Sequence, residues 1–179
     1  MPITRKPATG FTLIELLVAM TVLAIALGFA VSSFSKMMER QRLQAAAEGL
    51  YDMLLVARSE AINRNDNVYI SVVAGAGWCH GLDNTTACTC STADDCQVDG
   101  NTKVTSGTDF GAITLSSATN AQFRYNSRRG MPETTAGASL SSSTFTFTSS
   151  ASDSLSVVVS PVGRLSLCTS SGFRGYPAC

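Results

Sequence analysis

Residues 10–20 read GFTLIELLVAM, and this stretch decides the fold of the chain. It places a single carboxylate, Glu15, inside an otherwise apolar segment that continues to Val31. Ahead of it, residues 1–10 carry Arg5 and Lys6 and no acid. Because a charge inside such a segment is costly in a membrane, we expect Glu15 to have a functional partner.

The apolar segment predicts a transmembrane helix over residues 11–31. With a rise of about 1.5 Å per residue, a helix of this length spans roughly 30 Å, which matches the hydrocarbon core of a bilayer. Basic residues ahead of the segment keep that end in the cytoplasm under the positive-inside rule. We therefore expect a cytoplasmic N-terminus and a C-terminal domain outside it. An ordinary anchor with a glutamate near the membrane interface is the alternative.

Helical periodicity continues beyond the apolar segment and predicts an amphipathic helix over residues 32–64. No proline interrupts residues 11–64, so the two parts can form one helix. A cluster of Asn and Asp at residues 63–67 predicts its end. The apolar positions recur mostly three and four residues apart: Phe34, Met37, Met38, Leu43, Ala46, Ala47, Leu50, Met53, Leu54, Ala57, Ala61 and Ile62. The charged positions predicted to lie opposite are Arg40, Glu48, Asp52, Arg58, Glu60 and Arg64.

Residues 65–179 have the pattern of a β-rich domain. Short β-prone runs occur at residues 68–72, 121–125, 144–148, 155–159 and 165–168. The sequence SPVG at residues 160–163 suits a type I turn, so the last two runs are predicted to form a hairpin. The alternation of Phe145 and Phe147 predicts an exposed edge strand within a Ser- and Thr-rich region. The expected fold is α+β, with a long N-terminal helix packed on an antiparallel sheet.

The segment around Glu15 resembles the class III signal of type IV prepilins and pseudopilins. This resemblance implies that residues 1–10 are a leader peptide, which a prepilin peptidase removes between Gly10 and Phe11. It also implies N-methylation of Phe11 and a role for Glu15 in filament assembly. The chain would then be a single-pass protein of the inner membrane with residues 65–179 in the periplasm, later incorporated into a pilus or pseudopilus through residues 11–31.

Later segments resemble the GspH/FimT family of minor pseudopilins and minor pilins. The segments that carry the resemblance are LLVARSEAI at 54–62, Gly77-Trp78, FRYNSRRG at 123–130 and VVVSPVGRL at 157–165. It implies a pilin-like fold and a minor subunit that helps initiate or cap a type IV pilus or a type II secretion pseudopilus. The implied partners are other minor subunits, the major pilin or pseudopilin, and an inner-membrane assembly platform.

The chain has six cysteines, an even number that predicts disulfides in an exported domain. We expect Cys168 and Cys179 to close a short C-terminal loop. The other four, Cys79, Cys88, Cys90 and Cys96, allow three connectivities. Because a bridge between Cys88 and Cys90 would be strained, we expect Cys79 and Cys96 each to pair with one of them.

Neither metal site that the loop suggests fits its usual spacing. A zinc site from the four loop cysteines and His80 would usually need cysteine pairs with two to four residues between them, and only Thr89 separates Cys88 from Cys90. Asp94, Asp95 and Asp99 lack the spacing of an EF-hand and its final glutamate. We therefore expect no metal and no cofactor.

The sequence contains no set of residues typical of catalysis. His80 is the only histidine and lies among cysteines, and no G-x-S-x-G elbow or phosphate-binding glycine loop is present. We therefore expect a protein that is not an enzyme. An adhesin-like or merely anchored domain, with residues 79–101 as its recognition loop, is one alternative to a filament subunit.

DNA capture for natural transformation is a second alternative, because some FimT-like pilins carry a C-terminal G-R-x-R pattern. Here Gly163 and Arg164 are followed by Leu165 and Ser166, so the second arginine is missing. The other candidate DNA contacts are Arg174, Arg128 and Arg129. Residues 65–179 carry eight acidic and only six basic side chains, which opposes binding to a polyanion.

Overall fold

The computed structural model describes residues 10–179, apart from the side chains of residues 29–33. The chain divides into two compact units, Met1–Met38 and Glu39–Cys179, which are described separately below. The predicted leader peptide lies outside the described residues except for Gly10.

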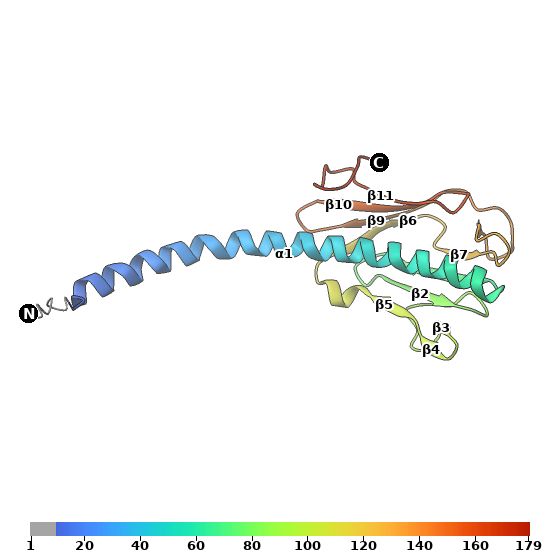
Figure 1. Ribbon diagram of the computed structural model, residues 1–179, viewed down its shortest axis with the longest axis horizontal. Coiled ribbons are helices and arrows are strands. Elements are labelled where there is room, and N and C mark those ends of the chain that lie inside the picture. Colours follow the sequence, from blue (N-terminus) through green and yellow to red (C-terminus); the bar gives the residue numbers. More distant parts are fainter. Residues whose placement is uncertain (1–9) are drawn as a thin grey trace, which may run out of the picture. The chain divides into compact units, whose positions relative to one another are not determined.

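The predicted helix is one element, α1 (Leu13–Arg64), drawn in blue to green in Figure 1. Its first turn is capped by Thr12, whose hydroxyl accepts a hydrogen bond from the Glu15 amide at 3.3 Å. Its end is a Schellman motif, because the amides of Asn65 and Asp66 donate to the carbonyls of Ile62 and Ala61. Asn65 has a φ of 53°, a conformation that Asn tolerates better than most residues.

The large apolar side chains in the first part of α1 are exposed. Between Leu13 and Leu27, the exposed fractions of these side chains run from 52 to 78%. In the part of the chain that the structure describes, no helix combines the length and apolar character needed to cross a membrane. The predicted membrane segment 11–31 includes residues whose side chains are not described, and it stays a prediction.

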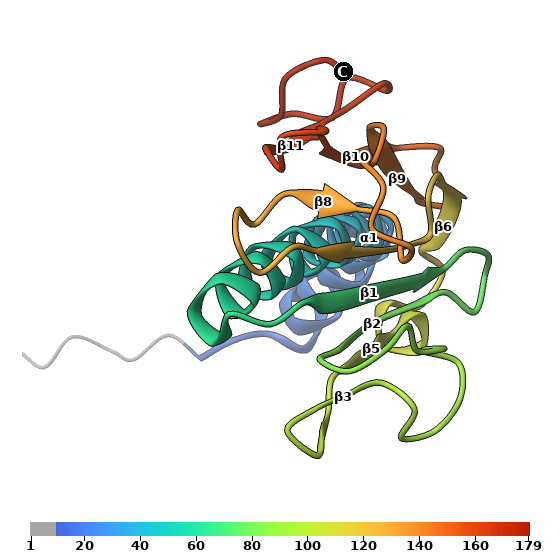
Figure 2. The same ribbon diagram turned by 90° about the vertical axis from the view of Figure 1, so that its right-hand side faces the viewer.

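The globular unit contains two larger antiparallel sheets and one small one. Sheet A has the order β5 (Val104–Ser106), β2 (Cys79–Asp83), β1 (Val68–Val73), β7 (Gln122–Tyr125) and β8 (Pro132–Glu133). Sheet B has the order β11 (Leu165–Cys168), β10 (Ser154–Val159), β9 (Ser143–Thr148) and β6 (Thr114–Ala118). The small sheet pairs β3 (Gln97–Val98) with β4 (Asn101–Thr102), and a short 3-10 helix, η1, spans Gly107–Phe110. A bridge between Gly75 and Leu115 joins sheets A and B, and Figure 2 shows the two sheets as one curved wall beside α1.

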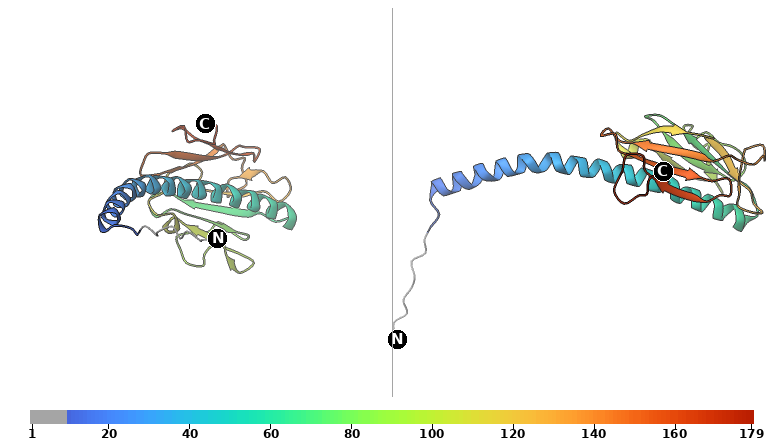
Figure 3. Two further views of the ribbon diagram at one scale, coloured as in Figure 1. Left: turned by 60° about the vertical axis from the view of Figure 1, so that its left-hand side comes forward. Right: turned by 90° about the horizontal axis from the view of Figure 1, so that it is seen from above.

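The core of the globular unit lies between α1 and this wall. In both views of Figure 3 the strands lie along the C-terminal part of α1. Small residues on the helix, such as Ala46, Ala57 and Ala61, are fully buried in this core. Facing them are the buried aromatic rings of Trp78, Phe123, Tyr125, Phe145 and Phe147. Each such side chain contributes on the order of 2 kcal/mol through burial.

Two expectations about these elements are wrong. Residues 144–148 do not form an edge strand, because β9 lies between β10 and β6 with Phe145 and Phe147 fully buried. Ile62 is 48% exposed and lies outside the buried core. The predicted hairpin is confirmed, since β10 and β11 pair antiparallel and the Gly163 amide donates to the Ser160 carbonyl at 2.8 Å.

Candidate assembly and interaction sites

The predicted processing and assembly residues lie together at the start of the described chain. Gly10 precedes α1 and is exposed, and Phe11 is 85% exposed, so the peptide bond between them lies in accessible, non-helical backbone. Glu15 lies in the first turn of α1. A carboxylate there interacts favourably with the positive end of the helix dipole. Glu15 follows Phe11 by four residues in the sequence.

Arg58 on α1 lies against two segments that are far from it in the sequence, one around Gly130 and one around Gly163. We call the place where these three segments meet the Arg58 junction. The Arg58 guanidinium donates to the Gly163 carbonyl at 2.8 Å, across 105 residues of sequence. Gly130 has a φ of 59°, and a Cβ there would come within 2.7 Å of Ile62 Cδ1. Gly163 has a φ of 79°, and a Cβ there would meet the Gly130 carbonyl at 3.0 Å. Both conformations favour glycine, and at Gly163 a side chain would also crowd a backbone carbonyl.

Arg58 therefore does not belong to the solvent-facing side of the helix, where periodicity placed it. It is half-buried and joins α1 to the loop before β8 and to the turn before β11. Periodicity alone could not show this, because the partner is a backbone carbonyl from a distant turn. One sequence signal did point to this contact. The three segments that meet there, LLVARSEAI, FRYNSRRG and SPVGR, are among those that carry the family resemblance.

The four candidate DNA contacts do not form one surface track. Arg128 and Arg129 are exposed in the loop after β7, and Arg164 is exposed at the neighbouring turn. The Arg164 amide and carbonyl close that turn through the Ser160 hydroxyl, at 2.9 Å, and the Ser160 amide, at 2.9 Å. Arg174 is exposed in the C-terminal loop, beyond β11.

The C-terminal loop is closed by a disulfide between Cys168 and Cys179. Phe173 and Tyr176 from this loop pack against the core. The Tyr176 hydroxyl donates to a Glu48 carboxylate oxygen at 2.6 Å, so the loop is tied to α1. Burial, together with this hydrogen bond, raises the pKa of Tyr176 to about 12. Periodicity predicts that Glu48 faces solvent, but this residue makes a tertiary contact with the C-terminal loop.

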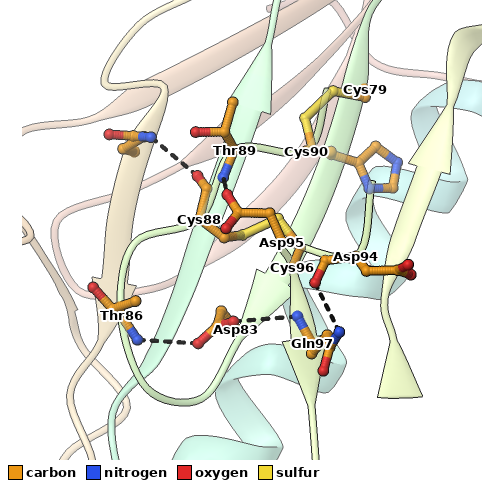
Figure 4. The surroundings of a disulfide bond; sticks show 12 residues. Cys79, Asp83, Thr86, Cys88, Thr89, Cys90, Asp94, Asp95, Cys96 and Gln97 are labelled. Atoms are coloured by element: carbon orange, nitrogen blue, oxygen red, sulfur yellow. Dashed lines mark hydrogen bonds between the residues drawn. A yellow bond between two sulfur atoms is a disulfide. The ribbon is translucent and has the colours of Figure 1, made fainter. Parts of the chain in front are cut away.

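The other two disulfides, Cys79–Cys90 and Cys88–Cys96, form a small buried cluster of sulfur atoms at one side of β2 (Figure 4). The structure thus selects one of the two connectivities that avoid a Cys88–Cys90 bridge. Asp83 organises the loop, since its carboxylate accepts hydrogen bonds from the amides of Thr85, Thr86 and Gln97. Burial raises the pKa of Asp83, but a hydrogen bond from the Thr85 hydroxyl, together with those from the three amides, outweighs it and holds that pKa below its usual range.

The surroundings of His80 suit a core residue. Its side chain stacks on Trp78 with ring centroids 5.9 Å apart, and its Nδ1 lies 3.0 Å from the Met53 sulfur. Burial lowers the pKa of His80 to about 4, which keeps the imidazole neutral at pH 7. All six cysteine sulfurs are in disulfides, so none is a thiolate for zinc. Within residues 10–179, no group of three His, Cys, Asp or Glu side chains is placed to hold a metal.

An open groove of about 460 Å³ lies between α1 and the strands β3 to β5. Its apolar part includes Val56, Leu82 and Val104. On one side of the groove, Arg64 forms ion pairs with Glu60 on the helix and with Asp99 at the β3–β4 turn. The cysteine-rich loop is thereby fastened to the end of α1.

Comparison with known proteins finds a family match for each part of the chain. Residues 46–163 match the sequence profile of a family described as type II transport protein GspH, and residues 5–31 match the prokaryotic N-terminal methylation motif. No curated protein matches the chain significantly.

Solved structures of two other proteins share the fold. The type IV minor pilin FimU of Pseudomonas aeruginosa is 21% identical with a TM-score of 0.51, covering 75% of this chain and 94% of FimU. The minor pseudopilin EpsH from the type 2 secretion system of Vibrio cholerae is 16% identical with a TM-score of 0.50, covering 72% of this chain and 97% of EpsH. The GspH profile spans the helix end, every strand except β11 and the Arg58 junction, and with the methylation motif ahead of it the chain belongs to the GspH family of pilin-like proteins.

Proposed function

We propose that this chain is a minor subunit of a type IV pilus or a type II secretion pseudopilus, acting in filament assembly and secretion. The observation that carries the proposal is the presence of the methylation motif at residues 5–31 and the GspH match at residues 46–163 in one chain. The motif supplies processing and anchoring, and the globular unit supplies a surface for other subunits. The chain is a structural subunit, and any energy for assembly comes from a partner.

The proposal includes a processing step and an assembly step at the start of α1. A prepilin peptidase cleaves after Gly10, Phe11 is N-methylated, and the helix over residues 11–31 holds the subunit in the inner membrane before assembly. The carboxylate of Glu15 then pairs with the ammonium group of a processed Phe11, in its own or a neighbouring subunit. Pairing offsets part of the cost of a buried charge, which is about 2.5–3.5 kcal/mol at the centre of a bilayer.

The experiment is to isolate filaments from cells that express the chain and to compare Glu15→Ala with Asp52→Ala. Asp52 is an exposed acid on the same helix, so it controls for the loss of a charge. We expect Glu15→Ala to remove the chain from the filament fraction and Asp52→Ala to leave it there. Mass spectrometry of the mature protein should show an N-methylated Phe11. Filament incorporation that is insensitive to Glu15→Ala would refute the assembly role.

A further inference from the structure

A pocket of about 310 Å³ lies beside the Arg58 junction and has no role in the processing and assembly steps described above. It is bounded by the loop between β7 and β8, by the start of β8 and by the turn between β10 and β11. Most of its lining comes from Asn126, Arg128, Arg129, Met131, Pro132 and Pro161.

The mouth of this pocket carries positive charge that nothing nearby neutralises. Within residues 10–179, neither Arg128 nor Arg129 forms an ion pair, and Arg164 is a third exposed arginine on the adjoining turn. Glu133 also lines the pocket, but its oxygens accept hydrogen bonds from Arg124 at 3.1 Å and from Asn126 at 2.9 Å. The unneutralised charge therefore favours an acidic occupant.

The walls of the pocket are held in place before any partner arrives. The Arg128 amide donates to the Asn126 side chain at 2.8 Å, and the Gly130 amide donates to the Asn126 carbonyl at 2.8 Å. The Ser127 amide donates to the Asn67 side chain at 3.2 Å, which fastens the loop near the end of α1. A preformed loop of this kind lowers the entropy cost of binding.

The size and lining of the pocket favour a protein side chain over a nucleic acid. Met131, Pro132 and Pro161 supply apolar contact for an aliphatic stem, while the two arginines can hold a carboxylate by paired hydrogen bonds. Among the residues that line it there is no aromatic ring on which a base could stack. The excess of acids over bases in residues 65–179 also disfavours an extended track of phosphate contacts.

We propose that this arginine pocket receives an Asp or Glu side chain from a neighbouring pilin-type subunit and thereby fixes which subunit lies beside this one. The inference rests on the proposed function, because it requires a filament neighbour. Such a contact joins two different surfaces, as the subunits of a helical assembly require.

The test uses the full chain in cells that assemble the filament, with a photo-crosslinking amino acid at Ser139, an exposed residue of the pocket lining. We expect crosslinks to a peptide of another pilin-type subunit that contains Asp or Glu. The yield should fall about tenfold or more in R128E/R129E and should persist in R128K/R129K. Arg174→Glu reverses one charge in the C-terminal loop, outside the pocket, where R128E/R129E reverses two; it is the control for charge reversal elsewhere on the surface and should leave the yield unchanged. Replacing the partner's acid by Lys should restore the crosslink to R128E/R129E.

Three outcomes would overturn the proposal. These are a crosslink yield that is unaffected by R128E/R129E, a crosslinked peptide without an acid, or a crosslinked species that nuclease digests. The last outcome would assign the pocket to nucleic acid. Filament incorporation is scored separately in the same cells. A chain that never enters filaments refutes the proposed function, whereas a chain that enters filaments without a charge-dependent crosslink refutes only the arginine pocket.

Discussion

Two ionisable side chains, Arg58 and His80, determine much of how the globular unit holds together. Arg58 uses its charge to bond a backbone carbonyl, which is a stronger interaction than a bond between neutral groups. His80 does the opposite and is neutral, since its ring is 2% exposed and lies against Trp78 and Met53. Both residues therefore act on stability through their protonation or charge, and each gives a specific prediction.

Burial of His80 predicts that stability falls as the pH is lowered from about 6.5 to about 4. In this window the unfolded chain binds a proton on His80 and the folded chain does not, because burial lowers the pKa of the folded state from 6.5 to about 4. The loss is on the order of 3 kcal/mol and is complete below pH 4. Urea unfolding of the full-length protein in detergent, followed by the fluorescence of Trp78, measures it.

His80→Phe is the control for this prediction, because phenylalanine keeps an aromatic ring and cannot be protonated. The difference in unfolding free energy between the native protein and His80→Phe should change with pH in that window. The pH dependence that carboxylates cause is the same in both proteins, so it cancels in this difference. Parallel pH profiles for the two proteins would show that His80 is accessible to protons in the folded state.

Removal of the Arg58 side chain should destabilise the globular unit more than removal of an exposed arginine. Arg58→Ala loses a charge-assisted hydrogen bond to Gly163 and is expected to cost about 1.5–3 kcal/mol. Arg40→Ala loses an ion pair to Asp153 whose arginine is 61% exposed, and should cost no more than about 1 kcal/mol. Equal costs in the same Trp78 unfolding assay would show that the Arg58 junction does not stabilise the fold.

At the scale of elements, α1 is the support to which each loop is attached separately. The C-terminal loop reaches it through Tyr176 and Glu48, and the cysteine-rich loop reaches it through Asp99 and Arg64. The two loops differ in how their disulfides are protected. Cys79, Cys88, Cys90 and Cys96 are all buried, whereas Cys179 is exposed.

This difference predicts the order in which the disulfides are reduced under native conditions. Thiol exchange requires access to a sulfur atom, so Cys168–Cys179 should be reduced about tenfold faster or more than the two buried disulfides. Quenching with an alkylating agent during dithiothreitol treatment, followed by peptide mass spectrometry, measures each pair. Labelling of Cys88 or Cys96 ahead of Cys179 would contradict the burial of the sulfur cluster.

At the scale of the whole molecule, the chain combines a unit rich in exposed apolar side chains with a unit that has its own core. The buried residues of that core begin at Leu43, and the large apolar residues before it, such as Phe34 and Met37, are exposed. The proposed function gives the first unit a membrane and filament role and the second unit the role of presenting surfaces such as the arginine pocket.

We therefore predict that residues 38–179 unfold with the same free energy as the full chain, within about 0.5 kcal/mol. No core residue of the described chain is lost on removing residues 1–37. Matched urea titrations of the fragment and of the full chain in the same detergent, read through Trp78, provide the comparison. A fragment that is less stable by more than about 2 kcal/mol would show that the first part of α1 supports the core.

The sequence by itself determined the features that depend on neighbouring residues. The helix to Arg64, its end at Asn65, the hairpin around residues 160–163 and the α+β class follow from periodicity, turn chemistry and a run of apolar residues. Each of these is encoded within a few residues, because helix and turn hydrogen bonds are local.

Only the tertiary structure decided the central place of β9, the partners of Cys88 and Cys90, and the roles of Arg58 and Glu48. In each case the deciding contact joins residues that are distant in sequence, as between Arg58 and Gly163. The Phe145 and Phe147 alternation shows that one face of a strand is buried, but it carries no information about which strands lie on either side. Strand order and disulfide pairing, and the surface that they create, depend on contacts between residues that are distant in the sequence. Local sequence patterns do not encode such contacts.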